Sequence, residues 1–186
     1  MTFCFPLSAL SPTLPRMKTH PSLLVLCGLL ALFAVRAGAE SAVSMGARYH
    51  TEHSVFTELP FEDGDMSYSL GYEYHDASGY WQIMVGYAPG AGSGTNSVDS
   101  VITPQINLLL SDRSWIGGVG ALASYIEGPD ESDWTDVYWQ VMFGLEIPIG
   151  SLKLEILTYY PFEEWGGFSD FEMDDLEFGA SLKYFF

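Results

Sequence analysis

Four stretches of this chain alternate apolar and polar residues with a period of two: 66–75, 137–147, 152–159 and 176–186. In the first, Met66, Tyr68 and Leu70 alternate with Ser67 and Ser69. Successive side chains of a β-strand point to opposite faces, so each stretch predicts a strand with one face in an apolar medium and the other in a polar one. Helical periodicity is weak throughout. Beyond the N-terminal region no run of 18 apolar residues predicts a membrane-spanning helix.

Four further strands are less regular, which brings the predicted total to eight. Pro104 weakens the fourth strand because proline cannot donate to the ladder. Glycines at 117, 118 and 120 leave the phase of the fifth strand open. Lengths of about 9–12 residues suit strands that cross a membrane at a tilt. The predicted strands are 42–50, 66–75, 80–88, 100–110, 115–126, 136–147, 151–160 and 175–186.

The connections between these strands alternate in length. Short turns are expected at 76–79, 111–114 and 148–150, whereas the other connections are longer, and the first and last of them have about 14 residues. Short turns at one end and long loops at the other are typical of a barrel in an outer membrane. We therefore expect the long loops to face the outside and both ends of the barrel domain to face the periplasm.

With this pattern the chain resembles the small eight-stranded outer-membrane barrels of the OmpA and OmpX type. The resemblance extends to the terminal strand, where Leu182, Tyr184 and Phe186 alternate as in the assembly signal of such proteins. It implies an all-β fold, an eight-stranded antiparallel up-and-down transmembrane β-barrel. It also implies outer-membrane lipid, lipopolysaccharide and the barrel assembly machinery as partners. The pattern matches no characterised subfamily, so no functional residues are transferred.

Residues 1–39 have the features of a secretory signal peptide. Arg16 and Lys18 precede an apolar run from Leu23 to Val35, and Ala37-Gly38-Ala39 provides a cleavage site. The apolar run is too short for an ordinary membrane-spanning helix, which needs about 20 residues. Met17 opens a better-proportioned signal, which makes it a candidate for the true start. The barrel domain is then 40–186, and both cysteines are removed with the signal, so the mature chain contains no disulfide or thiol chemistry.

Removal of the signal makes an acidic chain more acidic. The whole sequence has a net charge of −17, and the signal holds three of its seven basic residues and none of its 24 acids, which leaves −20 on residues 40–186. A chain of this charge lacks the clustered Lys and Arg that bind a phosphate backbone, so we expect no nucleic-acid partner. The hydrophobic content of 48% and aromatic content of 15% exclude a disordered chain.

Several charged residues share the parity of the polar strand faces and are predicted to lie inside the barrel. A charge on the lipid face would cost about 2–4 kcal/mol for Arg or Lys near the middle of the bilayer, whereas inside the barrel charges can pair. An eight-stranded barrel is only wide enough for side chains to fill it. We therefore predict a plugged lumen with a network of ion pairs in place of a solute pore. The predicted network consists of Arg48, Glu73, Glu146, Lys153, Glu155, Glu177 and Lys183.

Aromatic residues gather near both ends of the predicted strands, as in the two belts at membrane interfaces. The alternative is that aromatic residues are simply good strand formers. Tyr74, Trp81, Trp115 and Tyr184 fall near the short turns, and Tyr49, Tyr68, Tyr87, Tyr125 and Tyr160 fall near the long loops.

The long loops are rich in acids, and all of them are expected at the same end of the barrel. Carboxylate clusters can hold Ca²⁺ or Mg²⁺, which would bridge to lipopolysaccharide phosphates. The favoured alternative is a solvated anionic surface. The acids are Glu52, Glu58, Glu62, Asp63 and Asp65 in the first loop, Glu127, Asp130, Glu131, Asp133 and Asp136 in the third, and Glu163, Glu164, Asp170, Glu172, Asp174 and Asp175 in the fourth.

Two other functional classes remain as alternatives. His50 and His53, beside Ser54 and the loop acids, suggest a site that modifies lipid A, with histidine as base and serine as nucleophile. Without a more specific motif the favoured interpretation is that these histidines are not catalytic. We expect no enzymatic activity and no cofactor. The second alternative is a soluble periplasmic barrel that binds an apolar ligand, with its aromatic faces turned inward.

Overall fold

A computed structural model describes residues 40–51, 59–92, 97–129, 132–164 and 173–186. The predicted signal peptide lies outside these residues. The described chain is almost entirely β-structure, with one short 3₁₀-helix, η3 (Met173–Asp175). None of its helices is long and apolar enough to cross a membrane. The strands are β1 (Glu40–Tyr49), β2 (Met66–His75), β3 (Gly79–Ala88), β4 (Ser100–Asp112), β5 (Trp115–Leu122), β6 (Tyr125–Glu127), β7 (Ser132–Trp134), β8 (Tyr138–Ile149), β9 (Leu152–Phe162) and β10 (Glu177–Phe185).

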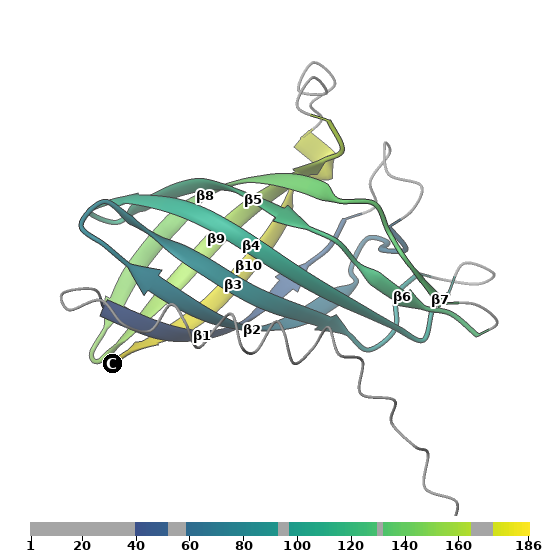
Figure 1. Ribbon diagram of the computed structural model, residues 1–186, viewed down its shortest axis with the longest axis horizontal. Helices are drawn as coiled ribbons and strands as arrows, with labels where there is room; N and C mark the ends of the chain where they lie inside the picture. Colours follow the sequence, from purple (N-terminus) through teal and green to yellow (C-terminus); the bar gives the residue numbers. More distant parts are fainter. Residues whose placement is uncertain (1–39, 52–58, 93–96, 130–131, 165–172) are drawn as a thin grey trace, which may run out of the picture. The chain divides into compact units, whose positions relative to one another are not determined.

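Eight long antiparallel strands close into a barrel (Figure 1). The ladder runs β3-β2-β1-β10-β9-β8-β5-β4, and β3 pairs with β4 to complete the circle. The strands β1 and β10 join over eight residue pairs, from Ala42 with Phe185 to Tyr49 with Phe178. Closure leaves no open edge among these strands, which is what a sheet needs in lipid, where no water can pair a free backbone group. The predicted all-β, eight-stranded barrel is confirmed.

The two faces of the barrel wall have opposite chemistry, as the alternation predicts. Leu70 and Tyr68 are exposed on the outer face of β2, whereas Ser67 and Glu73 of the same strand are buried inside. The same holds for β8, where Phe143 is exposed and Gln140 is buried. The interior holds these buried polar groups beside an apolar cluster that includes Leu109, Ile116 and Met142. An outer wall of exposed apolar side chains around buried charges is the reverse of a soluble barrel. The alternative of a soluble periplasmic barrel with inward aromatic faces is therefore wrong.

Three short turns lie at one end of the barrel, which we call the turn end, beside the C-terminal residue in Figure 1. The turn between β2 and β3 is organised by Asp76, whose Oδ1 accepts hydrogen bonds from the Ser78 backbone N–H (2.8 Å), the Ser78 hydroxyl (2.9 Å) and the Gly79 N–H (3.2 Å). The bonds from Ser78 hold the pKa of the Asp76 carboxyl below its usual range. The longer connections lie at the opposite end, the loop end.

The predicted strand 115–126 is divided in two opposite Pro104, which lies on the neighbouring strand β4. It forms β5 and β6, and both pair with β4 in one unbroken register. Only Ala123 and Ser124 lie outside the ladder, and Ala123 N–H donates to the Pro104 carbonyl (3.3 Å). The return bond cannot form, because proline has no N–H. The glycine-rich part of β5 keeps a regular phase, with Ile116 and Leu122 buried inside and Trp115 exposed.

The predicted turn at 148–150 is too long. Pro148 and Ile149 belong to β8 and pair with Lys153 and Leu152 of β9. A proline is tolerated here because β5 begins at Trp115, opposite Leu145, so β8 has β9 as its only neighbouring strand beyond that point. The observed turn consists of Gly150 and Ser151.

Six of the nine aromatic residues predicted for the two belts are exposed. These are Trp81, Trp115 and Tyr184 at the turn end and Tyr49, Tyr68 and Tyr87 at the loop end. Tyr74 and Tyr125 are half-buried. Tyr160 is buried and packs with Leu122, Tyr138 and Phe162.

The turn at Gly150 provides a test of local backbone strain. Gly150 has a φ of +63°, and a Cβ built on it meets nothing within 4 Å. Gly150→Ala should therefore cost about 1 kcal/mol from backbone conformation alone, measured by urea unfolding of the refolded barrel in lipid vesicles. Ser151→Ala is the control, because Ser151 is exposed and does not have a positive φ. Equal losses in the two variants would contradict this explanation.

Candidate functional site

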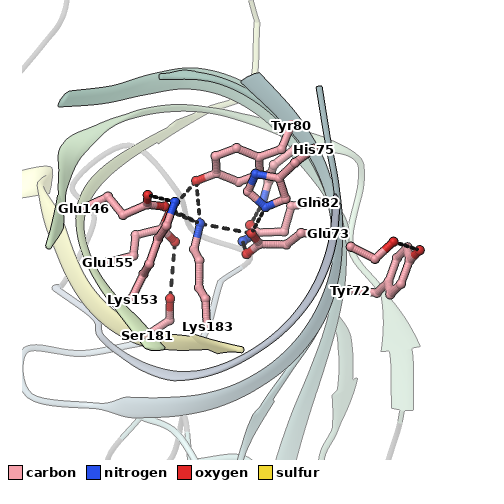
Figure 2. Close-up of polar contacts among 12 residues, drawn as sticks. Tyr72, Glu73, His75, Tyr80, Gln82, Glu146, Lys153, Glu155, Ser181 and Lys183 are labelled. Carbon is pink, nitrogen blue, oxygen red and sulfur yellow. Dashed lines mark hydrogen bonds and ion pairs between the residues drawn. The ribbon is translucent and has the colours of Figure 1, made fainter. Parts of the chain in front are cut away.

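The interior at the turn end is organised around Lys183 on β10. Its Nζ lies 2.6 Å from Glu155 Oε2, 3.0 Å from Glu73 Oε2 and 3.6 Å from Glu146 Oε2, and its side chain is fully buried. Figure 2 shows these carboxylates converging on Lys183 from different parts of the wall, whereas Tyr72 lies outside it. A buried ammonium group needs such partners, because an unpaired charge in this environment would be very costly.

Two pairs of like charges face each other across neighbouring strands in this cluster. Lys153 is paired in register with Lys183, and Glu146 with Glu155. Like charges in directly opposite positions repel. Here the repulsion within each pair is offset by contacts with the opposite charges of the other pair. Glu146 accepts from Lys153 (2.6 Å) and also approaches Lys183, so a square of alternating charges spans β8, β9 and β10.

Two rings complete the cluster on its other side. The Tyr80 hydroxyl donates to Glu155 and accepts from Lys183 Nζ (2.8 Å). His75 stacks on Tyr80, with ring centroids 4.4 Å apart, and its Nε2 lies 2.8 Å from Glu73 Oε2. Three carboxylates face two ammonium groups in this cluster. A positively charged His75 would bring its net charge to zero.

A chain of buried amides leads from this cluster toward the loop end. Gln82 donates to Glu73 (2.7 Å), and Asn107 donates to Gln82 (2.9 Å). Gln140 donates to Asn107 (2.8 Å) and accepts from an Arg48 terminal nitrogen (3.0 Å). All three amide side chains are buried. Each amide offers both donors and acceptors, which lets the chain pass through the interior without an unpaired group along it.

The chain ends in a second charged group at the loop end. Arg48 donates from Nε to Glu177, and its guanidinium lies 4.0 Å from the Tyr159 ring centroid. His50 Nδ1 lies 3.1 Å from Glu177 Oε2 without the alignment of a hydrogen bond. His50 Nε2 is hydrogen-bonded to Ser67 Oγ at 2.8 Å. Side-chain contacts thus run continuously from Lys183 to Ser67, and we call this series of residues the luminal network.

The structure places all seven predicted network residues on the inner face, in contact with one another in two groups. Glu73, Glu146, Lys153, Glu155 and Lys183 form the group at the turn end. Arg48 and Glu177 belong to the group at the loop end. Gln82, Asn107 and Gln140, which connect the two groups, are not among the residues predicted from the sequence. Their inward parity is the signal in the sequence that could have identified them.

A small cavity of about 30 Å³ lies inside the loop end. This is room for about two water molecules. Its lining includes the polar side chains of Arg48, His50, Ser67 and Glu177. It also includes Leu59 and Phe61 from the first loop, and the Phe61 ring stacks on His50 at 3.7 Å between centroids.

The other predicted residues lie on the surface or outside the described chain. Leu182, Tyr184 and Phe186 are exposed on the outer side, at or just beyond the end of β10, and their role as an assembly signal stays a prediction. His53 and Ser54 lie outside the described residues. The described residues contain no group of three His, Cys, Asp or Glu suited to a metal ion. The acids outside the described residues are Glu52, Glu58, Asp130, Glu131, Asp170 and Glu172.

Some described loop acids have structural contacts. Asp65 Oδ2 accepts from the Glu62 N–H and from the Gly92 N–H, both at 2.9 Å, and so joins the first loop to the second. Asp175 is buried. These two carboxylates are therefore parts of the loop architecture.

No family model matches the chain, and no curated protein does. Several solved structures are similar to it, including the following two. The crystal structure of Neisserial surface protein A is 10% identical and superposes with a TM-score of 0.51, over 80% of this chain and 99% of that one. Ail, the attachment invasion locus protein of Yersinia pestis, solved in complex with the heparin analogue sucrose octasulfate, is 12% identical, over 80% of this chain and 97% of that one, with a TM-score of 0.35.

The likeness to Neisserial surface protein A shows the fold. Together with the closed ladder and the apolar outer wall, it gives this chain the fold of a small outer-membrane β-barrel. This fold agrees with the outer-membrane location expected from the sequence.

Removal of Lys183 should reveal what the cluster at the turn end contributes. Lys183→Met leaves three carboxylates facing one another and should cost about 3–5 kcal/mol of unfolding free energy, measured by urea unfolding in lipid vesicles. The double variant Lys183→Met/Glu155→Gln should recover part of the loss, since it also removes one buried negative charge. Lys153→Met is the matched control, because that side chain is 39% exposed and water can replace its partner. Equal losses for Lys183→Met and Lys153→Met would contradict the central role of Lys183.

Proposed function

We propose that this protein is an integral outer-membrane barrel with a closed interior, whose role is structural or lies in contacts at the cell surface. The luminal network is the observation that carries the proposal. Together with the cluster around Lys183, its members come from seven of the eight barrel strands, all except β5, and from the first residue beyond β1 (Figure 2). They cross the interior as mostly buried polar groups.

Solute passage would require this network to be broken. The described interior offers a cavity of about 30 Å³ at the loop end, with the ionic cluster of Lys183 between it and the turn end. Breaking one buried pair costs about 3–5 kcal/mol when one partner is left uncompensated. A route through the barrel would have to break several such contacts together, which favours a sealed barrel over a pore.

The surface role rests on the loop end, where exposed acids gather. Divalent cations bound between these carboxylates and lipopolysaccharide phosphates would tie the barrel to the lipids around it. The acids also give the exposed end a field that repels anions. The exposed acids in the described connections at the loop end, including the short strands β6 and β7, are Asp63, Asp99, Glu127, Asp133, Asp136, Glu163, Glu164 and Asp174.

The closed interior is tested by two measurements on the same preparation. Protein from the outer-membrane fraction should migrate differently on an SDS gel before and after boiling, because a closed barrel resists the detergent until it is heated. The same folded protein in a planar bilayer should give no conductance steps like those of a water-filled porin measured in parallel. Recovery in the soluble fraction without a mobility shift would overturn the membrane barrel. A mobility shift together with steady conductance would overturn only the closed interior.

The lipid-facing surface is tested by a charge at Leu70. This side chain is 65% exposed on the outer wall, and its neighbours in register are Met45 and Val85. Leu70→Arg should cost about 2–4 kcal/mol if the position lies near the middle of the bilayer, measured as the unfolding free energy in vesicles. Asp174→Arg, at an exposed position in η3, is the control and should stay within about 0.5 kcal/mol. A tolerated Leu70→Arg would contradict contact between this wall and lipid.

A further inference from the structure

Ser67, His50 and Glu177 have the relative placement of a nucleophile, a base and the group that orients the base. Ser67 Oγ is 2.8 Å from His50 Nε2, and His50 Nδ1 is 3.1 Å from Glu177 Oε2. The serine and the carboxylate therefore lie against opposite nitrogens of one imidazole ring, which is the arrangement that activates a serine for attack on a carbonyl. The three residues come from β2, from the position after β1, and from the start of β10.

The three side chains are held in place independently of any substrate. All three residues are buried, and the His50 ring stacks on Phe61 with an angle of 6° between the ring planes. His50 is also fixed through its backbone, because its N–H donates to the Asp65 carbonyl at 2.8 Å. The contact from Nδ1 to Glu177 is close but not aligned. The parallel stacking against Phe61 leaves the imidazole ring free to turn in its own plane. Such a turn could align Nδ1 with Glu177, since catalytic hydrogen bonds in free enzymes commonly tighten only when a substrate binds.

The surroundings of Ser67 include a cation and apolar side chains. Arg48 is the direct partner of Ser67 in the register of β1 and β2, and its guanidinium is bonded to Glu177 and Gln140. The ion pair with Arg48 fixes the Glu177 carboxylate, which lies 3.1 Å from His50 Nδ1. The lining of the cavity beside them includes the apolar side chains of Leu59, Phe61 and Leu122 among polar ones. A small acyl group would meet apolar side chains there.

We propose that Ser67, His50 and Glu177 form a serine acyl-hydrolase site that accepts small carboxylic esters from the loop end. The loop end is the open direction because the cluster around Lys183 fills the turn end. This activity lies beyond the structural and surface role proposed above, and either can hold without the other. From the sequence we expect no enzymatic activity, and the serine nearest to His50 and His53 in the sequence is Ser54, which precedes β2. The serine that contacts His50 is on the neighbouring strand, 17 residues along the chain.

The reaction balances without a cofactor. Ser67 Oγ bonds to the carbonyl carbon while its proton passes to His50 Nε2, and Glu177 stabilises the resulting imidazolium. The carbon–oxygen bond to the alcohol then breaks, and the alcohol leaves with the proton from His50. Water attacks the acyl-serine in the same manner, which releases the carboxylic acid and returns the proton to Ser67. Because the cavity has room for only about two water molecules, an acetyl-sized acyl group is the largest that we expect to fit, and the alcohol part of the ester would have to lie outside it, toward the loop end.

The test uses the full barrel refolded in detergent micelles, with its fold checked by mobility on an unboiled SDS gel. Diisopropyl fluorophosphate is the probe, because an activated serine displaces its fluoride and keeps the phosphoryl group. We expect labelling of folded wild-type protein at Ser67, located by peptide mass spectrometry, and no labelling after heat unfolding. Hydrolysis of p-nitrophenyl acetate should fall at least about 100-fold in Ser67→Ala and in His50→Gln.

Ser44→Ala is the matched control. Ser44 is a buried inward hydroxyl on β1 with no hydrogen-bond partner among the described residues, so its loss makes the same chemical change without touching His50. This variant should keep labelling and hydrolysis within about two-fold of wild type. An unlabelled folded wild type, a label at another residue, or hydrolysis that persists in Ser67→Ala would overturn the proposal and leave the three side chains a structural contact. None of these results would alter the mobility or conductance tests of the closed barrel.

Discussion

The narrow interior of an eight-stranded barrel is the constraint on which the rest of this structure depends. A circle of eight strands leaves space for side chains and little else, so any charge that points inward must find its counter-charge inside. Lys183 meets this condition with three carboxylates, and Arg48 with Glu177. The strand register follows from the same condition, because a shift by one residue would exchange the inner and outer faces and place these charges in lipid.

Much of this arrangement was accessible from the sequence because the period of a strand is short and strict. Parity alone placed Glu73, Lys183 and the other charged residues inside, and the short turns fixed the order of the strands. Parity cannot say which charges meet. Lys183 and Glu73 belong to strands that are not neighbours, and their contact depends on how the strands are staggered around the closed barrel. For the same reason Ser67 could not be chosen over Ser54 as the partner of His50.

The remaining differences from the sequence analysis come from proline, whose effect depends on its neighbours. Pro104 has a strand on each side, and the ladder with β5 and β6 is interrupted where its N–H is missing. Pro148 has a neighbouring strand, β9, on one side only, and β8 continues through it without a break. The local sequence does not reveal how many neighbours a residue will have. Only the lengths of the surrounding strands decide it.

The position of Lys183 and Glu177 on the same strand links the pairing of charges to the closure of the barrel. β10 is the last of the eight barrel strands in chain order, and its pairing with β1 completes the ladder. Without this strand, Glu73, Glu146 and Glu155 would lack Lys183, and Arg48 would lack Glu177. The strand that removes the last free sheet edges is therefore also the strand that supplies a charge partner at each end of the interior.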